Sequence, residues 1–216
     1  MKKMEQEVEI PVANAVIEGS LAIPSKAKGI VLFAHGSGSG RFSPRNRYVA
    51  KILNEAGVGT LLVDLLAKDE EAVDVATGEF RFNIDLLSER LVFATEWLMK
   101  NPATKNLILG YFGASTGAAA AIIAAIKFPE TVRVIVSRGG RPDLAMEHLW
   151  RVRAPTLLIV GGRDAVVIDL NKKALDRLQV EKRLEVVPGA THLFEEPGKL
   201  EEVAKLSADW FVAHFR

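Results

Sequence analysis

The stretch Leu107-Ile-Leu-Gly-Tyr-Phe-Gly-Ala-Ser-Thr-Gly117 decides how the chain is organised. It opens as a short apolar run typical of a buried strand, and the alanine-rich residues 118–126 that follow it predict a helix. Between them lies a Gly-x-Ser-x-Gly motif in the strand–turn–helix context of a nucleophile elbow. Gly113 and Gly117 lack a Cβ, so the turn can tighten and the helix can lie close to neighbouring strands. Ser115 is therefore a candidate nucleophile, with a helix N-cap as the alternative interpretation.

The composition is that of an ordinary globular protein. The 216 residues are 49% hydrophobic and 25% charged, which predicts a single domain over residues 1–216. A formal net charge of +1 favours neither nucleic acid nor a membrane surface as a partner. The absence of cysteine excludes disulfides, thiol nucleophiles and cysteine-based metal sites.

The amino-terminal residues alternate in charge where a signal peptide would need an apolar core. No apolar stretch is long enough to span a bilayer. We therefore expect a soluble, cytoplasmic protein with no membrane or nucleic-acid partner, and its oligomeric state is left open.

Apolar runs and helical stripes alternate along most of the chain. An antiparallel hairpin is expected within residues 8–23, and residues 65–79 are predicted to be an irregular surface connection. Strands are predicted at residues 29–34, 58–63, 107–112, 132–136, 155–160 and 183–187, and helices at residues 42–56, 84–98, 168–178 and 197–215, with a short helix from Pro142. This order predicts an α/β fold with a mainly parallel twisted sheet, helices on both faces and no cap domain.

Polar side chains follow the predicted strands, at the edge where open parallel sheets bind their ligands. Three of them, Ser115, Asp164 and His192, are the residue types of a nucleophilic hydrolase, in the chain order serine, aspartate, histidine. A serine hydroxyl needs an adjacent base, a histidine can accept and return its proton, and a carboxylate orients the imidazole. Asp143 and Asp169 are the alternative candidates for the acid.

An oxyanion hole would have to complete such a site. The elbow geometry predicts one donor at the backbone amide of Thr116, and the loop after residues 29–34 supplies the second, at Ser37 or else at Gly36. His35 in that loop is interpreted as a loop organiser rather than a base. Asp64 is interpreted as a structural hydrogen-bonding residue.

Four loops together carry a resemblance to a known family. They are His35-Gly-Ser-Gly38, Gly113-Ala-Ser-Thr-Gly117, Gly161-Gly-Arg-Asp164 and Gly189-Ala-Thr-His192. With these loops the chain resembles the α/β-hydrolase superfamily from end to end, and is most similar to its small, capless dienelactone-hydrolase-like branch. Dienelactone hydrolases proper carry cysteine at the nucleophile, where this chain has Ser115. The resemblance implies ester or related acyl hydrolysis without a cofactor or metal.

The leading hypothesis is a serine hydrolase that cleaves small carboxylic esters or lactones through an acyl-enzyme. A peptidase, an amidase or an acyltransferase could use the same triad. A non-catalytic ligand-binding protein on the same fold is the alternative from another class, because fold alone does not settle function.

Arginines follow two of the predicted strands. Arg138 and Arg141 flank Gly139-Gly140, and Arg41 and Arg45 follow the predicted oxyanion loop. Arginine presents a fork of donors that matches carboxylates and phosphates. Arg138 and Arg141 are therefore candidate binding residues for an anionic substrate, unless these arginines pair with neighbouring acids such as Asp143.

Overall fold

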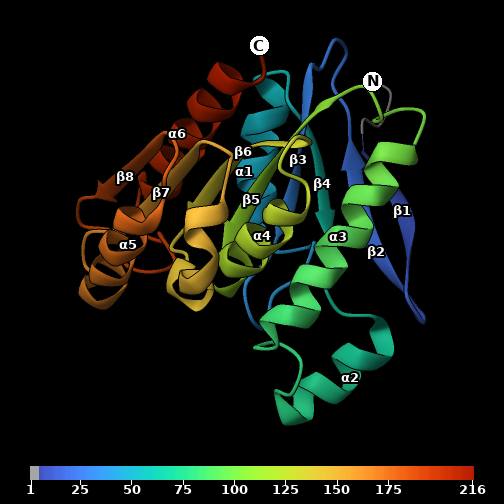
Figure 1. Cartoon of the computed structure of the whole chain (residues 1–216), viewed down its shortest axis with the longest axis horizontal. Helices are drawn as coiled ribbons and strands as arrows, with labels where there is room; N and C mark the ends of the chain where they lie inside the picture. Colours follow the sequence, from blue (N-terminus) through green and yellow to red (C-terminus); the bar gives the residue numbers. More distant parts are fainter. Residues whose placement is uncertain (1–4) are drawn as a thin grey trace.

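The computed structural model describes residues 5–216, in which eight strands form one twisted sheet with helices against both faces (Figure 1). The strands are β1 (Glu5–Val12), β2 (Ala15–Ala22), β3 (Gly29–Ala34), β4 (Gly59–Val63), β5 (Ile108–Ala114), β6 (Val132–Arg138), β7 (Thr156–Gly161) and β8 (Lys182–Val187). The helices are α1 (Pro44–Glu55), α2 (Lys68–Thr77), α3 (Ile84–Lys100), α4 (Thr116–Lys127), α5 (Ala165–Arg177) and α6 (Lys199–His214), with the 3₁₀ helix η1 (Pro142–Arg151).

The strand order is β1-β2-β4-β3-β5-β6-β7-β8. The pairs β1–β2 and β2–β4 are antiparallel and the remaining neighbours are parallel, which confirms the predicted amino-terminal hairpin and mainly parallel sheet. The chain leaves β3 towards one edge, for β4, and then returns to the other side of β3 to form β5. This reversal of direction is a topological switch point, where the loops after the strands leave room for a ligand.

Strand β5 shows why both faces of the sheet are covered. Its side chains alternate between the faces, so Leu109 and Tyr111 belong to one apolar core while Phe112 and Ala114 belong to the other. The first core is closed by α3, α4, α5 and η1, and the second by α1 and α6 (Figure 1). Tyr111 and Phe112 are fully buried, and each such side chain stabilises the fold by roughly 1.5–3 kcal/mol.

The prediction of an irregular connection over residues 65–79 is wrong, because most of this segment is helix α2. Its start is stabilised by Glu70, whose carboxylate accepts from the Ala67 amide, and by further acidic residues in the first turn. Gly78 ends it with a left-handed conformation (φ 69°). The residues that begin and end α2 are visible in the sequence. The helix nevertheless lacks the apolar stripe by which the other helices are predicted.

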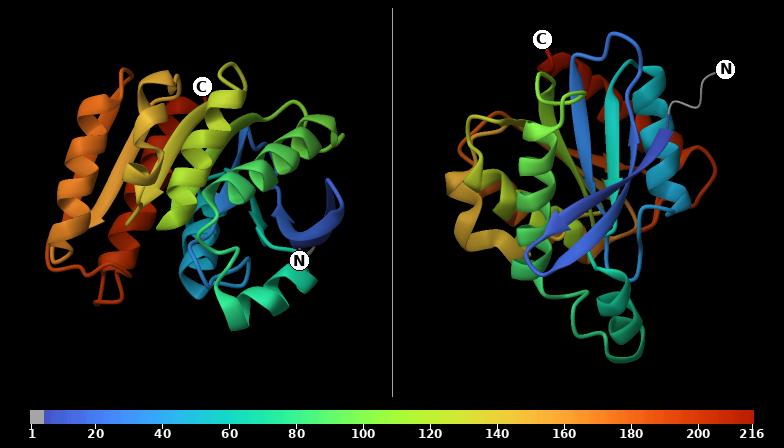
Figure 2. Two further views of the ribbon diagram at one scale, coloured as in Figure 1. Left: turned by 60° about the horizontal axis from the view of Figure 1, so that its bottom comes forward. Right: turned by 90° about the vertical axis from the view of Figure 1, so that its right-hand side faces the viewer.

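Helix α2 projects beyond the end of the sheet (Figure 2) and is held there by polar contacts. The carboxylate of Asp74, only 3% exposed, accepts from the amides of Phe80 and Arg81 and from the Arg81 guanidinium. Glu70 pairs with Arg90 of α3, which joins the other side of α2 to the body of the molecule. None of the helices within residues 5–216 is long and apolar enough to cross a bilayer.

Strand β6 is longer than predicted. It was expected to end at Val136, but pairing continues until Arg138 lies between Ala114 of β5 and Ile159 of β7. The polar residues Ser137 and Arg138 therefore belong to a central strand. Their backbone positions pair with the neighbouring strands β5 and β7, and this pairing does not depend on whether a side chain is polar. Helix α5 also begins earlier than predicted, directly after Asp164.

Candidate active site

Ser115 occupies a strained turn between β5 and α4. Its backbone has φ 50° and ψ −123°, a conformation that costs a non-glycine residue about 1–3 kcal/mol. The amide of Ser115 donates to the carbonyl of Arg138 (3.2 Å), and its carbonyl accepts from the amide of Arg141 (3.0 Å). The Ser115 side chain makes no helix-capping hydrogen bond, which removes the N-cap interpretation.

The glycines of the motif make this turn possible. A Cβ on Gly117 would lie 2.3 Å from the carbonyl oxygen of Ala34, and one on Gly113 would lie 2.4 Å from Cα of Ala118. Real Cβ atoms do not approach backbone so closely, so either side chain would push α4 away from the strands. This confirms the tight turn and the close helix approach expected from the motif.

Asp164 and His192 are brought together from loops after β7 and β8. The Nδ1 atom of His192 lies 2.6 Å from Oδ2 of Asp164, and the side chains are 37% and 17% exposed. A carboxylate at Nδ1 holds the proton on that nitrogen and leaves Nε2 free to act as a base. The alternative acids lie elsewhere: Asp143 pairs with Arg141, and Asp169 is an exposed residue beside Lys172.

The loop between β6 and η1 lies between Ser115 and His192. Its backbone bonds to both the amide and the carbonyl of Ser115. A Cβ on Gly139 in the same loop would lie 3.0 Å from the His192 carbonyl oxygen and 3.5 Å from Cε1 of its ring. Ser115 and His192 therefore border the same four-residue segment.

The predicted oxyanion loop lies against Ser115. A Cβ on Gly36 would be 3.0 Å from Cβ of Ser115. The Ser37 amide donates to the Thr116 hydroxyl (3.1 Å), and the two hydroxyl oxygens are 2.9 Å apart. The Ser37 hydroxyl also donates to the carbonyl of Arg81 (3.0 Å), beyond α2. In this structure the Ser37 amide is thus occupied by a side chain that a substrate oxygen would displace, and its oxyanion role stays a prediction.

His35 organises this loop, as predicted. Its Nε2 accepts from the Leu65 amide (2.9 Å), so Nδ1 carries the proton and donates to the carbonyl of Gly36 (2.9 Å). Burial lowers the pKa of His35, against the opposing influence of the Gly36 carbonyl, Asp64 and Glu71. With both ring nitrogens engaged, His35 has no free nitrogen to serve as a base.

The state of His35 predicts how stability depends on pH. Because the folded-state pKa is lowered, the unfolded chain takes up this proton first as the pH falls. The contribution of His35 is present above its ordinary pKa of about 6.5 and is lost as the pH falls from there through the folded-state pKa. We expect the Tm of the parent to fall more steeply between about pH 8 and pH 5 than the Tm of His35→Asn. Equal slopes in the two proteins would contradict this role.

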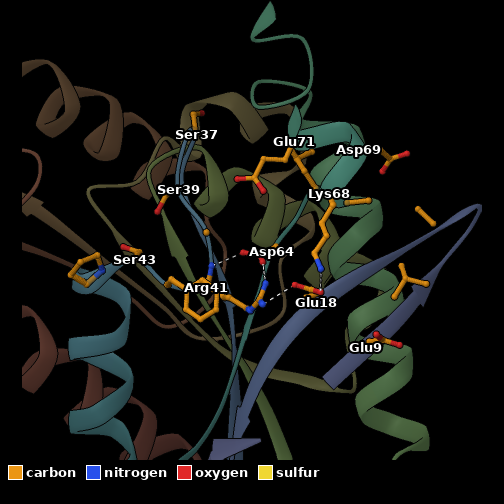
Figure 3. A pocket seen from close by; sticks show the side chains of 18 of the residues that line it. Glu9, Glu18, Ser37, Ser39, Arg41, Ser43, Asp64, Lys68, Asp69 and Glu71 are labelled. Atoms are coloured by element: carbon orange, nitrogen blue, oxygen red, sulfur yellow. Dashed lines mark hydrogen bonds and ion pairs between the residues drawn. The ribbon is translucent and has the colours of Figure 1, made fainter. Parts of the chain in front are cut away.

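Asp64 and Arg41 form the floor of a hollow of about 1130 Å³ beside the oxyanion loop (Figure 3). Asp64 accepts from the Arg41 amide (2.7 Å) and pairs with its guanidinium, as expected for a structural role. Arg41 also contacts Glu18 (2.7 Å) and Glu7 (3.2 Å), so its charge is already balanced. The hollow extends from Ser37 to Arg45.

The two candidate anion-binding arginines differ. Arg141 donates twice to Asp143 (2.9 and 2.8 Å), the structural pairing considered from the sequence, and its binding role stays a prediction. Arg138 is only 7% exposed, and its Nε and Nη1 atoms are sealed from solvent without a hydrogen-bond partner among residues 5–216.

Two residues that support the loops of the candidate site were not predicted from the sequence. Asn171 of α5, fully buried, donates to the carbonyl of Gly140 (3.0 Å) and so holds the loop that borders Ser115. Glu196 accepts from the Thr191 amide (3.1 Å) and thereby holds the loop that carries His192. A polar residue inside an amphipathic helix was the one sequence signal for Asn171. Within residues 5–216, no group of three or more histidine, aspartate or glutamate side chains is placed to hold a metal ion.

The sheet order, the strained turn after β5 and the loops around it make up the α/β-hydrolase fold. A family model described as "Dienelactone hydrolase family" matches residues 17–213, and the chain belongs to this family. A crystal structure of a dienelactone hydrolase from Anabaena variabilis is 57% identical, with a TM-score of 0.96 over 99% of this chain and 100% of that one. Est1E from Butyrivibrio proteoclasticus shares the fold at 14% identity, with a TM-score of 0.81 over 96% and 98% of the two chains.

Two curated relatives are named as transferases and not as hydrolases. A protein of Mycobacterium tuberculosis, present in two strains and named "Putative phosphoribosyl transferase", is 54% identical over 210 residues. The match covers 97% of this chain and 46% of the relative. This chain therefore spans less than half the length of those proteins.

Proposed function

We propose that this chain is a serine hydrolase that cleaves small carboxylic esters or lactones. The proposal rests chiefly on one observation, the 2.6 Å contact between His192 Nδ1 and Asp164 Oδ2 beside a loop that also binds the backbone of Ser115. Three loops distant in sequence supply a nucleophile, a base and an orienting acid at one edge of the sheet. Family membership supports hydrolysis as the reaction class.

The proposed reaction begins when Oγ of Ser115 attacks the ester carbonyl carbon. Nε2 of His192 takes the hydroxyl proton and then gives it to the departing alkoxide, which leaves as an alcohol. A water molecule, deprotonated by the same nitrogen, then attacks the acyl-serine and releases the carboxylic acid. Asp164 stabilises the imidazolium that forms in both steps.

The negative charge that develops on the carbonyl oxygen of the substrate must be stabilised by hydrogen-bond donors. We assign the amides of Thr116 and Ser37 to this role, and each such donor is worth about 2.7–4 kcal/mol of transition-state stabilisation. The substrate oxygen can accept from the Ser37 amide only after the Thr116 hydroxyl has turned away from that amide. In the structure as it stands, the same Thr116 hydroxyl also lies 2.9 Å from the Ser37 hydroxyl.

Labelling with a fluorophosphonate probe tests this proposal. We expect one equivalent of probe on the folded protein, located at Ser115 by peptide mapping, because the reagent requires an activated serine. Heat-unfolded protein and the Ser115→Ala variant serve as controls and should remain unlabelled. An unlabelled folded protein would favour the non-catalytic ligand-binding alternative, and a label on another serine would refute the assigned nucleophile.

A further inference from the structure

Arg138 is a buried cation without a counterion. It lies two residues beyond Val136 and four beyond Val134 on β6, so its side chain points to the face of the sheet covered by α1 and α6. Within residues 5–216 the structure shows no hydrogen bond or ion pair from its guanidinium, and Nε and Nη1 are sealed. An unpaired buried charge is strongly destabilising unless another group compensates it.

The neighbouring arginines, in contrast to Arg138, are paired with carboxylates. Arg41, Arg81 and Arg141 lie at the same end of the sheet, and each contacts at least one carboxylate. Burial, together with repulsion from Arg45, lowers the pKa of Arg138 to about 10. Arg138 thus still carries its charge at neutral pH, and no acid of the described chain neutralises it.

Arg45 adds a second positive group near Arg138. Its Nη1 atom contacts Glu195 (2.9 Å), a carboxylate that is 63% exposed, while its Nε atom is sealed without a partner. Arg45 lies in the first turn of α1, and that turn contains no acidic residue. The start of the 12-residue helix is capped by the Ser43 side chain, which accepts from the Asn46 amide, but no acidic residue in the first turn offsets its positive end of about half a charge.

The hollow described above connects Arg45 to the oxyanion loop, since both Ser37 and Arg45 line it, while Arg138 and Ser115 are not among the residues that line it. A substrate whose ester lies at Ser115 and Ser37 can therefore extend towards Arg45 and α1. An ion pair to a carboxylate as exposed as Glu195 is weak, because water screens it, so a ligand can replace Glu195.

The charges at this site favour one kind of anion. Two guanidinium groups and the helix terminus, set against Glu195, leave an excess of about one and a half positive charges at this end of the hollow, whereas Glu9, Asp69 and Glu71 line its other end (Figure 3). A carboxylate supplies one negative charge, whereas a phosphate monoester carries about 1.5 to 2 at neutral pH. Phosphate also offers three oxygens to donors that approach from different sides.

We propose that the ester substrate carries a phosphate monoester, which binds between Arg138, Arg45 and the amino terminus of α1. This rests on the proposed hydrolase function. The ester bond is the one that is broken, and the phosphate serves as a handle that remains in one of the products.

Binding is tested first, in a protein that cannot turn over. Inorganic phosphate and acetate are titrated calorimetrically into the Ser115→Ala variant. We expect phosphate to bind and acetate to bind at least tenfold more weakly, and the phosphate Kd to rise at least tenfold when Arg45→Gln or Arg138→Gln is added. Arg133→Gln, at the exposed start of the same strand, is the control and should leave the phosphate Kd unchanged.

Several outcomes of the titration would overturn the proposal. They are absence of phosphate binding, tighter binding of acetate, and equal binding in the Arg45→Gln variant. Because Arg45 is at the surface edge of the site, its variant keeps the test valid if Arg138→Gln fails to fold, which circular dichroism would show.

Catalysis provides the second test. The kcat/KM for 2-acetoxyethyl phosphate is compared with that for 2-acetoxyethanol, its neutral counterpart. We expect the parent to favour the phosphorylated ester at least tenfold, to release acetate without inorganic phosphate, and to lose most of this preference in Arg45→Gln. Equal kcat/KM values in the parent would refute the phosphate handle. Hydrolysis of neither ester, with phosphate binding intact, would instead count against the proposed hydrolase function.

Discussion

Replacing Ser115 with alanine should reduce the hydrolysis of p-nitrophenyl acetate by about three to six orders of magnitude, as expected when the nucleophile of a triad is removed. Alanine fits the same backbone, because the turn at φ 50° is imposed by bonds from Arg138 and Arg141 rather than by the serine hydroxyl. The Tm of the variant should therefore stay close to that of the parent. Initial rates at matched concentration of folded protein are the measurement.

Ser39→Ala is the matched control for this experiment. Ser39 lies in the oxyanion loop and lines the hollow, but its hydroxyl makes no hydrogen bond to residues 5–216. Its removal should leave the rate within about twofold of the parent, in keeping with a surface substitution. If Ser115→Ala retained the parent rate, the ester hydrolysis would have to arise at another residue.

The second large effect is expected at the acid. Asp164→Asn should lower kcat by about four orders of magnitude, because an amide no longer holds the Nδ1 proton of His192 and the imidazole adopts the wrong tautomer. His192→Ala should lower kcat at least as far, since it removes the proposed base itself. Both are measured as kcat with the same ester, alongside the Tm.

The competing acids provide the controls. Asp169→Asn removes an exposed carboxylate and should have no effect on kcat. Asp143→Asn breaks the pair with Arg141 and should change stability more than rate. If Asp164→Asn were silent while either of these variants lost activity, the acid would be misassigned.

Local patterns in the sequence are sufficient to predict the central elements of the fold. Strand β5, the turn at Ser115 and helix α4 were all expected, because a buried parallel strand is apolar throughout and a tight turn against a helix requires glycine on both sides. The hairpin and the parallel order follow from the same kind of pattern. The missed helix, α2, packs few apolar side chains and is stabilised by its end residues and by ion pairs, which leave no periodic stripe in the sequence.

The sequence by itself determined which residue types follow the strands, and the chain order serine, aspartate, histidine singled out Ser115, Asp164 and His192. Only the tertiary structure decided how their neighbours are used. Arg138 and Arg141 are three positions apart and look equivalent in the sequence, yet Arg138 is buried without a partner in the described part of the chain and Arg141 pairs with Asp143. The contact of Ser37 with Thr116 joins residues 79 positions apart. Such differences depend on which side chains the packed sheet brings together and which it shields from water. Neither the partners of a side chain nor its burial can be read from the local order of residues.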